Sequence, residues 1–194
     1  GKGNGTCRAQ HILQGGSSPG SVAVSDVNGD GKPDLVTANG NSGSASVLLG
    51  NGNGTFQAQQ TFDVGSKPHT VAVSDVNGDG EPDLIIANYG HTVGVLLGNG
   101  NGTFQSPVFY FAGLSPYSLA AGDLNGDGTT DLGVSNLDGN SVSGLLGNGN
   151  ETFRSAANYS AGGKGETGAV GDFDGQGGDE PDDPVADRSA GVAC

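Results

Sequence analysis

The chain has 194 residues, of which 39 are glycine, and only 33% of its residues are hydrophobic. Its net charge of −14, with only seven Lys and Arg residues, argues against nucleic acid or an anionic membrane as a partner. No apolar stretch approaches the roughly 20 residues of a membrane span. There is no signal peptide or initial Met, so we expect a mature or partial chain without membrane insertion.

Low apolar content with high net charge is typical of disordered chains, but a regular repeat overrides that expectation here. Stacked repeats bury together a core that no single repeat could bury alone. In chain order, we expect residues 1–16 to supply one strand of an incomplete unit. Three complete units follow at 17–65, 66–113 and 114–162, and 163–194 supply the other three strands of the incomplete unit. The whole chain is then one repeat domain.

An Asp-rich loop marks each unit, beginning at Asp26, Asp75, Asp123 and Asp172, which are 49, 48 and 49 residues apart. Calcium binds six to eight oxygen atoms from carboxylates, amides, backbone carbonyls and water. Loop positions 1, 3, 5 and 9 offer side-chain oxygens, and position 7 offers a backbone carbonyl. The predicted ligands in the first three loops are Asp26, Asn28, Asp30, Lys32, Asp34, Asp75, Asn77, Asp79, Glu81, Asp83, Asp123, Asn125, Asp127, Thr129 and Asp131.

The fourth loop departs from this pattern. Its candidate ligands are Asp172, Asp174 and Asp182, but it carries two extra residues and a Gln near position 5. We therefore expect Ca²⁺ in three loops and do not expect full occupancy of the fourth. Magnesium prefers a smaller, water-rich shell, and the loops contain no His/Cys cluster for zinc. An EF-hand is excluded because position 12 holds Thr37, Ile86 or Val134 instead of Glu. A solvated Asx-rich turn is the alternative.

The unit at 66–113 predicts four short strands and no helix. Residues 70–74 alternate, 83–87 and 93–97 are apolar runs, and 104–111 follow a Gly/Asn hairpin turn. Four antiparallel strands in about 45–50 residues are typical of a β-propeller blade. The D-x-N-x-D-G-x-x-D-L loop and the trailing L-L-G-N-G-N-G-T-F resemble the FG-GAP/VCBS repeat family of integrin α-chain propellers. The resemblance covers nearly the whole chain, and it implies a calcium-binding, usually extracellular β-propeller.

The chain ends suggest how the propeller closes. The N-terminal strand completes a fourth blade with the C-terminal strands, which predicts an all-β ring of four blades. Cys7 matches Phe104, and Cys194 falls near Val95 or Leu96, so we expect a Cys7–Cys194 disulfide across a hairpin. Two free thiols are the alternative. The remaining possibilities for the fold are a fragment of a larger propeller and a strand-exchanged assembly.

Function should lie where the repeats differ. The calcium loops and Asn-Gly hairpins are expected on one face, and the variable residues on the other. We predict a ligand surface there from His69, Tyr89, His91 and Tyr117, with ordinary loop residues as the alternative. The sequons at Asn4, Asn53, Asn101, Asn150 and Asn158 are candidate glycosylation sites, although Asn-Gly is also a favoured hairpin turn.

No catalytic constellation is evident, since there is no G-x-S-x-G element and no open metal position, and the three His residues are scattered. We therefore expect no enzymatic activity. The calcium loops and the disulfide indicate a secreted or cell-surface location. The leading hypothesis is an adhesion or ligand-binding module for an extracellular protein or glycan. A self-associating subunit of a filament or surface layer, and a non-catalytic domain of a larger enzyme or receptor, are the alternatives.

Overall fold

A computed structural model describes residues 16–162, 169–170 and 192–193 of the chain. Three four-stranded antiparallel sheets make up residues 16–162, and within each sheet the strands are neighbours in chain order. The first sheet contains β1 (Pro19–Ser25), β2 (Asp34–Asn39), β3 (Ser44–Leu48) and β4 (Gln60–Asp63). The second contains β5 (Pro68–Ser74), β6 (Asp83–Asn88), β7 (Thr92–Leu96) and β8 (Val108–Phe111). The third contains β9 (Pro116–Gly122), β10 (Asp131–Asn136), β11 (Ser141–Leu145) and β12 (Ala157–Ser160).

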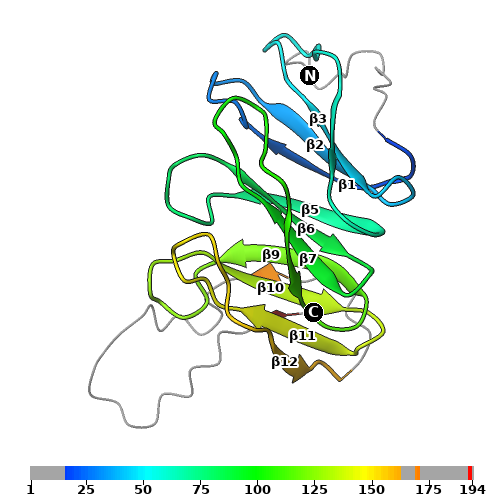
Figure 1. Cartoon of the computed structure of the whole chain (residues 1–194), viewed down its shortest axis with the longest axis vertical. Helices are drawn as coiled ribbons and strands as arrows, with labels where there is room; N and C mark the ends of the chain where they lie inside the picture. The colour runs from blue at the N-terminus through cyan, green and yellow to red at the C-terminus, as the bar shows by residue number, and fades with distance from the viewer. Residues whose placement is uncertain (1–15, 163–168, 171–191, 194) are drawn as a thin grey trace, which may run out of the picture.

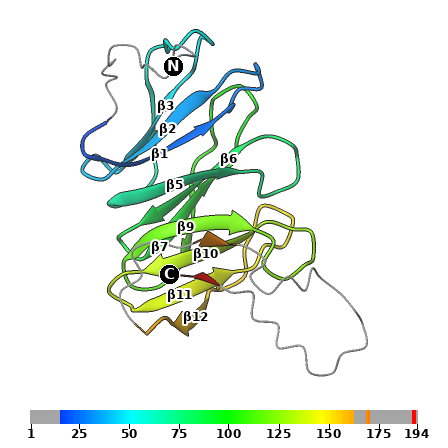
Figure 2. The same cartoon turned by 180° about the vertical axis from the view of Figure 1, so that it is seen from behind.

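The sheets are stacked along the long axis of the molecule (Figure 1). Their first strands lie one above the other, with β1 against β5 and β5 against β9 (Figure 2). Blades of a propeller pack in this way, with the first strand of each blade innermost. The all-β, propeller-like fold expected from the sequence is confirmed, with no helix among the residues described.

Two apolar cores hold the stack together. Leu84 and Ile86 of β6 belong to the core shared with the first sheet, whereas Ile85 and Ala87 belong to the core shared with the third. Since successive side chains of a strand point to opposite faces, β6 must be apolar at every one of these positions. All four are fully buried. The apolar run in the sequence therefore marks a strand sandwiched between two neighbouring blades.

The fourth strand of the second blade is shorter than the sequence predicts. The sequence predicts one strand over residues 104–111, but β8 begins only at Val108, and Phe104 makes an isolated bridge to Gly98. Pro107 lies between these two parts, and proline has no backbone N–H to donate to a ladder. Phe104 turns instead against Phe62 of the first blade, with ring centroids 5.3 Å apart. Phe153 contacts Tyr110 of the second blade in the same way.

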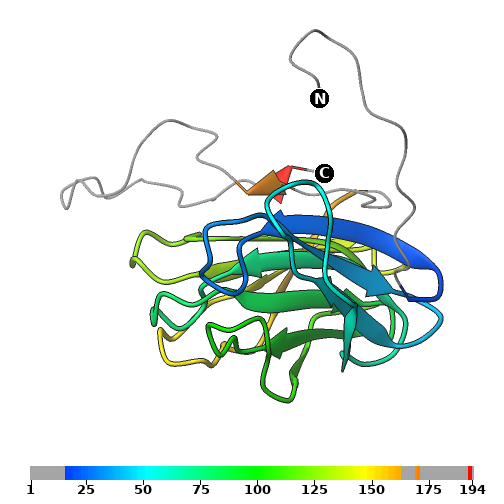
Figure 3. The same ribbon diagram turned by 90° about the horizontal axis from the view of Figure 1, so that it is seen from above.

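A short two-stranded sheet follows the third blade. β13 (Ala169–Val170) pairs with β14 (Val192–Ala193), drawn in orange and red in Figure 3. β13 also contacts β9. The sequence predicts three consecutive strands within residues 163–194, so that the second would separate the first from the third. Direct pairing of β13 with β14 differs from that order. The residues between β13 and β14 lie outside the described part of the chain.

The described sheets do not close into a ring. Residues 1–15, which include the expected closing strand, Cys7 and Asn4, lie outside the described part of the chain, as does Cys194. The expected pairing of the two cysteine positions across the hairpin is wrong in the second blade. Phe104, the counterpart of Cys7, lies opposite Gly98, whereas Val95 lies opposite Val108. The hairpin register therefore does not place the counterparts of the cysteines face to face, and the disulfide stays a prediction.

Candidate metal centres

The first three Asp-rich loops connect the first two strands of their blades. Each contains two glycines with positive φ, which are 71° and 77° for Gly29 and Gly31 of the first loop. A Cβ atom is disfavoured in this region, so glycine allows the tight turn of the loop backbone. The corresponding glycines of the other two loops also have positive φ, and they are Gly78, Gly80, Gly126 and Gly128.

The first aspartate of each loop organises the turn. In the first loop, Asp26 Oδ1 accepts a hydrogen bond from the N–H of Asp30 (3.2 Å), and Asp26 Oδ2 accepts one from Gly31 (2.6 Å). Asp75 and Asp123 accept the equivalent bond from Gly80 and Gly128, each at 2.8 Å. The same pattern in three blades shows that the sequence repeat is also a repeat of side-chain geometry.

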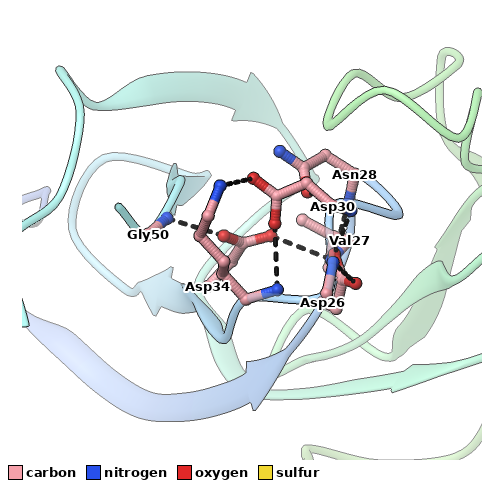
Figure 4. Close-up of polar contacts among 8 residues, drawn as sticks. Asp26, Val27, Asn28, Asp30, Asp34 and Gly50 are labelled. Carbon is pink, nitrogen blue, oxygen red and sulfur yellow. Dashed lines mark hydrogen bonds and ion pairs between the residues drawn. The ribbon is translucent and has the colours of Figure 1, made fainter. Parts of the chain in front are cut away.

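The ninth loop residue, Asp34 in the first blade, has a second role that the sequence did not indicate. Its Oδ2 accepts the N–H of Val27 (2.9 Å) and its Oδ1 accepts the N–H of Gly50 (2.6 Å), as Figure 4 shows. Asp34 is fully buried. It thus joins the Asp-rich loop to the hairpin between the third and fourth strands.

The other two blades repeat this pair of hydrogen bonds to a buried aspartate from the loop and from the hairpin, which we call the aspartate clamp. Asp83 bridges Val76 and Gly98 at 2.9 and 2.8 Å. Asp131 bridges Leu124 and Gly147 at 2.9 and 2.7 Å. Only glycine fits at the hairpin position, because a Cβ on Gly98 would lie 2.2 Å from the Pro82 carbonyl oxygen. The recurring L-L-G in the sequence was the available signal for this contact.

The carboxyl groups of a loop differ in electrostatic environment. Burial raises the pKa of Asp83 and of Asp131, although each accepts two backbone hydrogen bonds that act in the opposite direction. The hydrogen bond from Lys32 lowers the pKa of exposed Asp30, and that from the Thr129 side chain lowers the pKa of Asp127. Uncompensated negative charge is therefore most costly at the buried ninth position.

The predicted ligand atoms of the loops are of the kind that calcium binds. Every predicted ligand atom is oxygen, and each carboxylate oxygen that accepts one N–H retains a further lone pair. The loop side chains turn back onto their own backbone amides, and in the described residues no three Asp, Glu, His or Cys side chains form a metal-type group. Each predicted set includes three aspartates, and in the structure the three carboxylates of a loop are not gathered into one group. Calcium in these loops remains a prediction.

The loops and the hairpins share one face of the stack, as expected. The N–H of Gly102, in a second-blade hairpin, donates to the carbonyl of Val27 in the first loop (3.1 Å). Thr130 of the third loop donates through its hydroxyl to the Asp75 carbonyl of the second loop (2.9 Å). Neighbouring loops are thus tied to one another across the blade boundaries.

The opposite face brings the four predicted ligand-surface residues into two groups. His69 and Tyr117, from the inner strands β5 and β9, have ring centroids 3.8 Å apart. Tyr89 donates from its hydroxyl to Asp138 Oδ2 (2.8 Å), and the Ser115 hydroxyl donates to the same oxygen (2.7 Å). His91 joins this second group because its Nδ1 accepts the N–H of Ser115 (3.3 Å). Sequence reasoning did not find Ser115, which is buried.

Comparison with known proteins identifies the family. A sequence model described as the FG-GAP-like repeat matches residues 26–86 and 75–134, which together span more than half of the chain. The chain belongs to the FG-GAP-like repeat family. No match was found among the curated proteins.

Solved structures resemble this FG-GAP-like chain at low sequence identity. BBS1N in complex with ARL6DN, soaked with mercury, has a TM-score of 0.54 at 14% identity, covering 81% of this chain and 48% of the other. The same complex soaked with lead has a TM-score of 0.37 at 14% identity, and the match covers 75% of this chain and 56% of the other. The Tc holotoxin pore of Photorhabdus luminescens has a TM-score of 0.44 at 22% identity, and the match covers 72% of this chain and 7% of the other. The first similarity supports the propeller-like fold, and this chain spans less than two thirds of each of these proteins.

Three of the sequon asparagines lie at exposed hairpins of the FG-GAP-like repeats. Asn53 Oδ1 accepts hydrogen bonds from the Thr55 N–H (2.9 Å) and hydroxyl (2.7 Å). Asn101 and Asn150 each accept the hydroxyl of the Thr two residues later at 2.6 Å. The hydrogen bond within the turn thus accounts for the presence of both Asn and Thr in these three sequons. Asn158 lies on β12, and its side chain accepts a hydrogen bond from Ser143.

The remaining predicted ligands, Asp172, Asp174 and Asp182, lie outside the described residues of the FG-GAP-like chain. Across the part of the chain that the structure covers, no helix has the length and apolarity needed to cross a bilayer.

Proposed function

We propose that the chain is a secreted, calcium-binding FG-GAP-like module that recognises an extracellular protein or glycan ligand. The observation that carries the proposal is the division of the molecule into two faces. One face repeats the same Asp-rich loop in three blades, with closely matching hydrogen bonds in each. The other face carries side chains that differ from blade to blade.

In this proposal calcium stabilises the scaffold. It would be held by the side chains at positions 1, 3, 5 and 9 of each loop and by the position 7 carbonyl, and when bound it would neutralise clustered carboxylates. The ninth-position aspartates, Asp34, Asp83 and Asp131, would then couple calcium to the adjacent hairpins through the backbone bonds they already make.

The second face supplies the recognition surface. His69 and Tyr117 are half-buried and their rings are in tilted contact, which presents a preformed aromatic pair. The hydrogen bond from Tyr89 to Asp138 favours one position of the Tyr89 ring before any ligand arrives. Preorganised aromatic groups lose little conformational entropy on binding, which favours their use in recognition.

We further infer that another blade covers the outer face of the first sheet. Val22 and Val24 are 61% and 65% exposed, whereas Val71 and Leu119, the counterparts of Val22, are 6% and 7% exposed at blade interfaces. Four blades closed by residues 1–16 would provide this cover. A further blade of a longer propeller, or a second copy in a filament, would meet the same apolar surface.

Binding assays test the recognition proposal. The full chain in calcium should bind members of a printed glycan array or capture a defined extracellular protein, and a Tyr89→Ser/Tyr117→Ser variant should bind at least tenfold more weakly. An Asn53→Ser variant, altered on the loop face, is the control. Blank arrays and blank pull-downs with calcium present would overturn the proposal. A covalent ladder in non-reducing electrophoresis would favour the filament instead.

A further inference from the structure

The outer strand of the second blade differs from its counterparts. β8 places Val108, Phe109 and Phe111 at the surface, where they are 53%, 46% and 62% exposed. Strand registers show that the equivalent residues are polar in β4, namely Gln60, Thr61 and Asp63. In β12 they are Ala157, Asn158 and Ser160. One blade thus carries an exposed apolar outer strand that the repeat itself does not require.

β8 is also an edge. Among the described residues it pairs with β7 alone, so its other side presents unpaired backbone N–H and C=O groups. Exposed apolar edge strands tend to pair with other chains, and proteins usually blunt them with charge. Asp63 supplies such a charge in β4, and Phe111 replaces it in β8.

A hollow of about 340 Å³ adjoins this edge. Phe109, Tyr110 and Phe111 line one side, and residues 153–156 of the third blade line the other. A second hollow of about 170 Å³ shares Tyr110 and is lined by Val95, Leu97 and Val108, among others. The two hollows therefore form a groove along β8, between the second and third blades.

The floor of the groove is fixed. Tyr110 and Phe153 meet edge to face with ring centroids 5.3 Å apart, and the Tyr110 hydroxyl donates to the Glu151 carbonyl (3.2 Å). Arg154, on the third-blade wall, donates from Nε to Asn148 Oδ1 (3.3 Å). A rigid floor and a free strand edge suit an extended ligand, which could pair with β8 and place alternate side chains in the hollows.

We propose that the β8 groove binds an extended, apolar segment of a partner protein by β-strand addition, and that this segment is neutral or basic. The charge follows from the net charge of −14 on the chain, which three bound Ca²⁺ would reduce to about −8 and which disfavours acidic segments and a second copy of itself. Within the hollows, Arg154 and Glu151 offset one another. This surface is separate from the Asp-rich loops and from the His69–Tyr117 face, so the inference stands apart from the proposed function.

The experiment selects nine-residue peptides from a random display library on the full chain in calcium-containing buffer. Enriched peptides are synthesised, and their binding is measured by fluorescence anisotropy. We expect alternating apolar residues flanked by Lys or Arg, and slowed amide exchange at residues 108–111 in the complex. Replacing the strand with its first-blade counterparts, Val108→Gln/Phe109→Thr/Phe111→Asp, should weaken binding at least tenfold.

Tyr159→Ser is the matched control, because Tyr159 is an exposed aromatic (64%) on the outer strand β12, outside both hollows. It should leave binding unchanged, and circular dichroism verifies that both variants fold. Enrichment of acidic peptides, or equal binding by the triple variant, would overturn the proposal. So would failure to enrich any peptide that protects residues 108–111, or a dimer that forms without peptide and is lost in the triple variant.

Discussion

At the scale of single residues, the ninth loop aspartate has two roles, as a predicted calcium ligand and as an acceptor of two backbone hydrogen bonds. The sequence alone indicated only the first. Asp83 is fully buried and accepts two backbone hydrogen bonds, whereas Asp79 of the same loop is exposed. In calcium-free buffer, Asp83→Asn should lower the free energy of unfolding by about 1–3 kcal/mol, because one buried N–H loses its acceptor. Asp79→Asn should change it by less than about 0.5 kcal/mol. Urea unfolding in EGTA measures the change for each variant. Equal changes would contradict a stabilising role of the aspartate clamp at Asp83.

Glu151 provides a second test at this scale. It has a φ of 72°, and it occupies the hairpin position held by Gly54 (87°) and Gly102 (80°) in the other blades. Because a Cβ strains this conformation, Glu151→Gly should stabilise the protein by about 1 kcal/mol in urea unfolding. Glu151→Ala removes the same charge but keeps the Cβ, so it should not give this gain. Equal stabilisation by both variants would point to charge as the cause.

At the scale of the loop, proton and calcium binding should compete. Calcium needs ionised carboxylates, and the pKa of Asp83 and of Asp131 is raised by burial. These two groups therefore take up a proton at a higher pH than ordinary exposed aspartates. Calcium affinity should fall as the pH is lowered, beginning above the usual aspartate range. Calorimetric titration between pH 7 and pH 4 measures this, and constant affinity down to pH 4 would contradict it.

The strands could be predicted from the sequence because their signals are local. Alternation in β5 and the apolar run in β6 mark an inner and a central strand directly. Long-range contacts have no such local signal. The bond from Gly98 to Asp83 and the packing of Phe104 on Phe62 depend on how hairpins and blades meet, as does the groove beside β8. For the same reason, aligned positions alone placed the cysteine counterparts in the wrong hairpin register.

At the scale of the whole molecule, the outer face of the first sheet tests closure. If a further blade covers Val22 and Val24, then Val22→Ser/Val24→Ser in the full chain should lower the free energy of unfolding by about 2 kcal/mol or more. Surface substitutions far from packed interfaces usually change stability by less than about 0.5 kcal/mol. A change that small would show that this face is open to solvent. Analytical ultracentrifugation then distinguishes cover within one chain from cover by a second copy.

The central claim is that the Asp-rich loops bind calcium and thereby stabilise the stacked blades. Its most direct test is calcium titration of the full, chelator-stripped chain by calorimetry, paired with thermal unfolding. Three ions should bind per chain, and the melting temperature should rise with calcium because an ion bound only by the native state stabilises it. Triple replacement of Asp30, Asp79 and Asp127 by Asn should abolish both effects. No binding heat, together with an unchanged melting temperature in EGTA, would contradict the account.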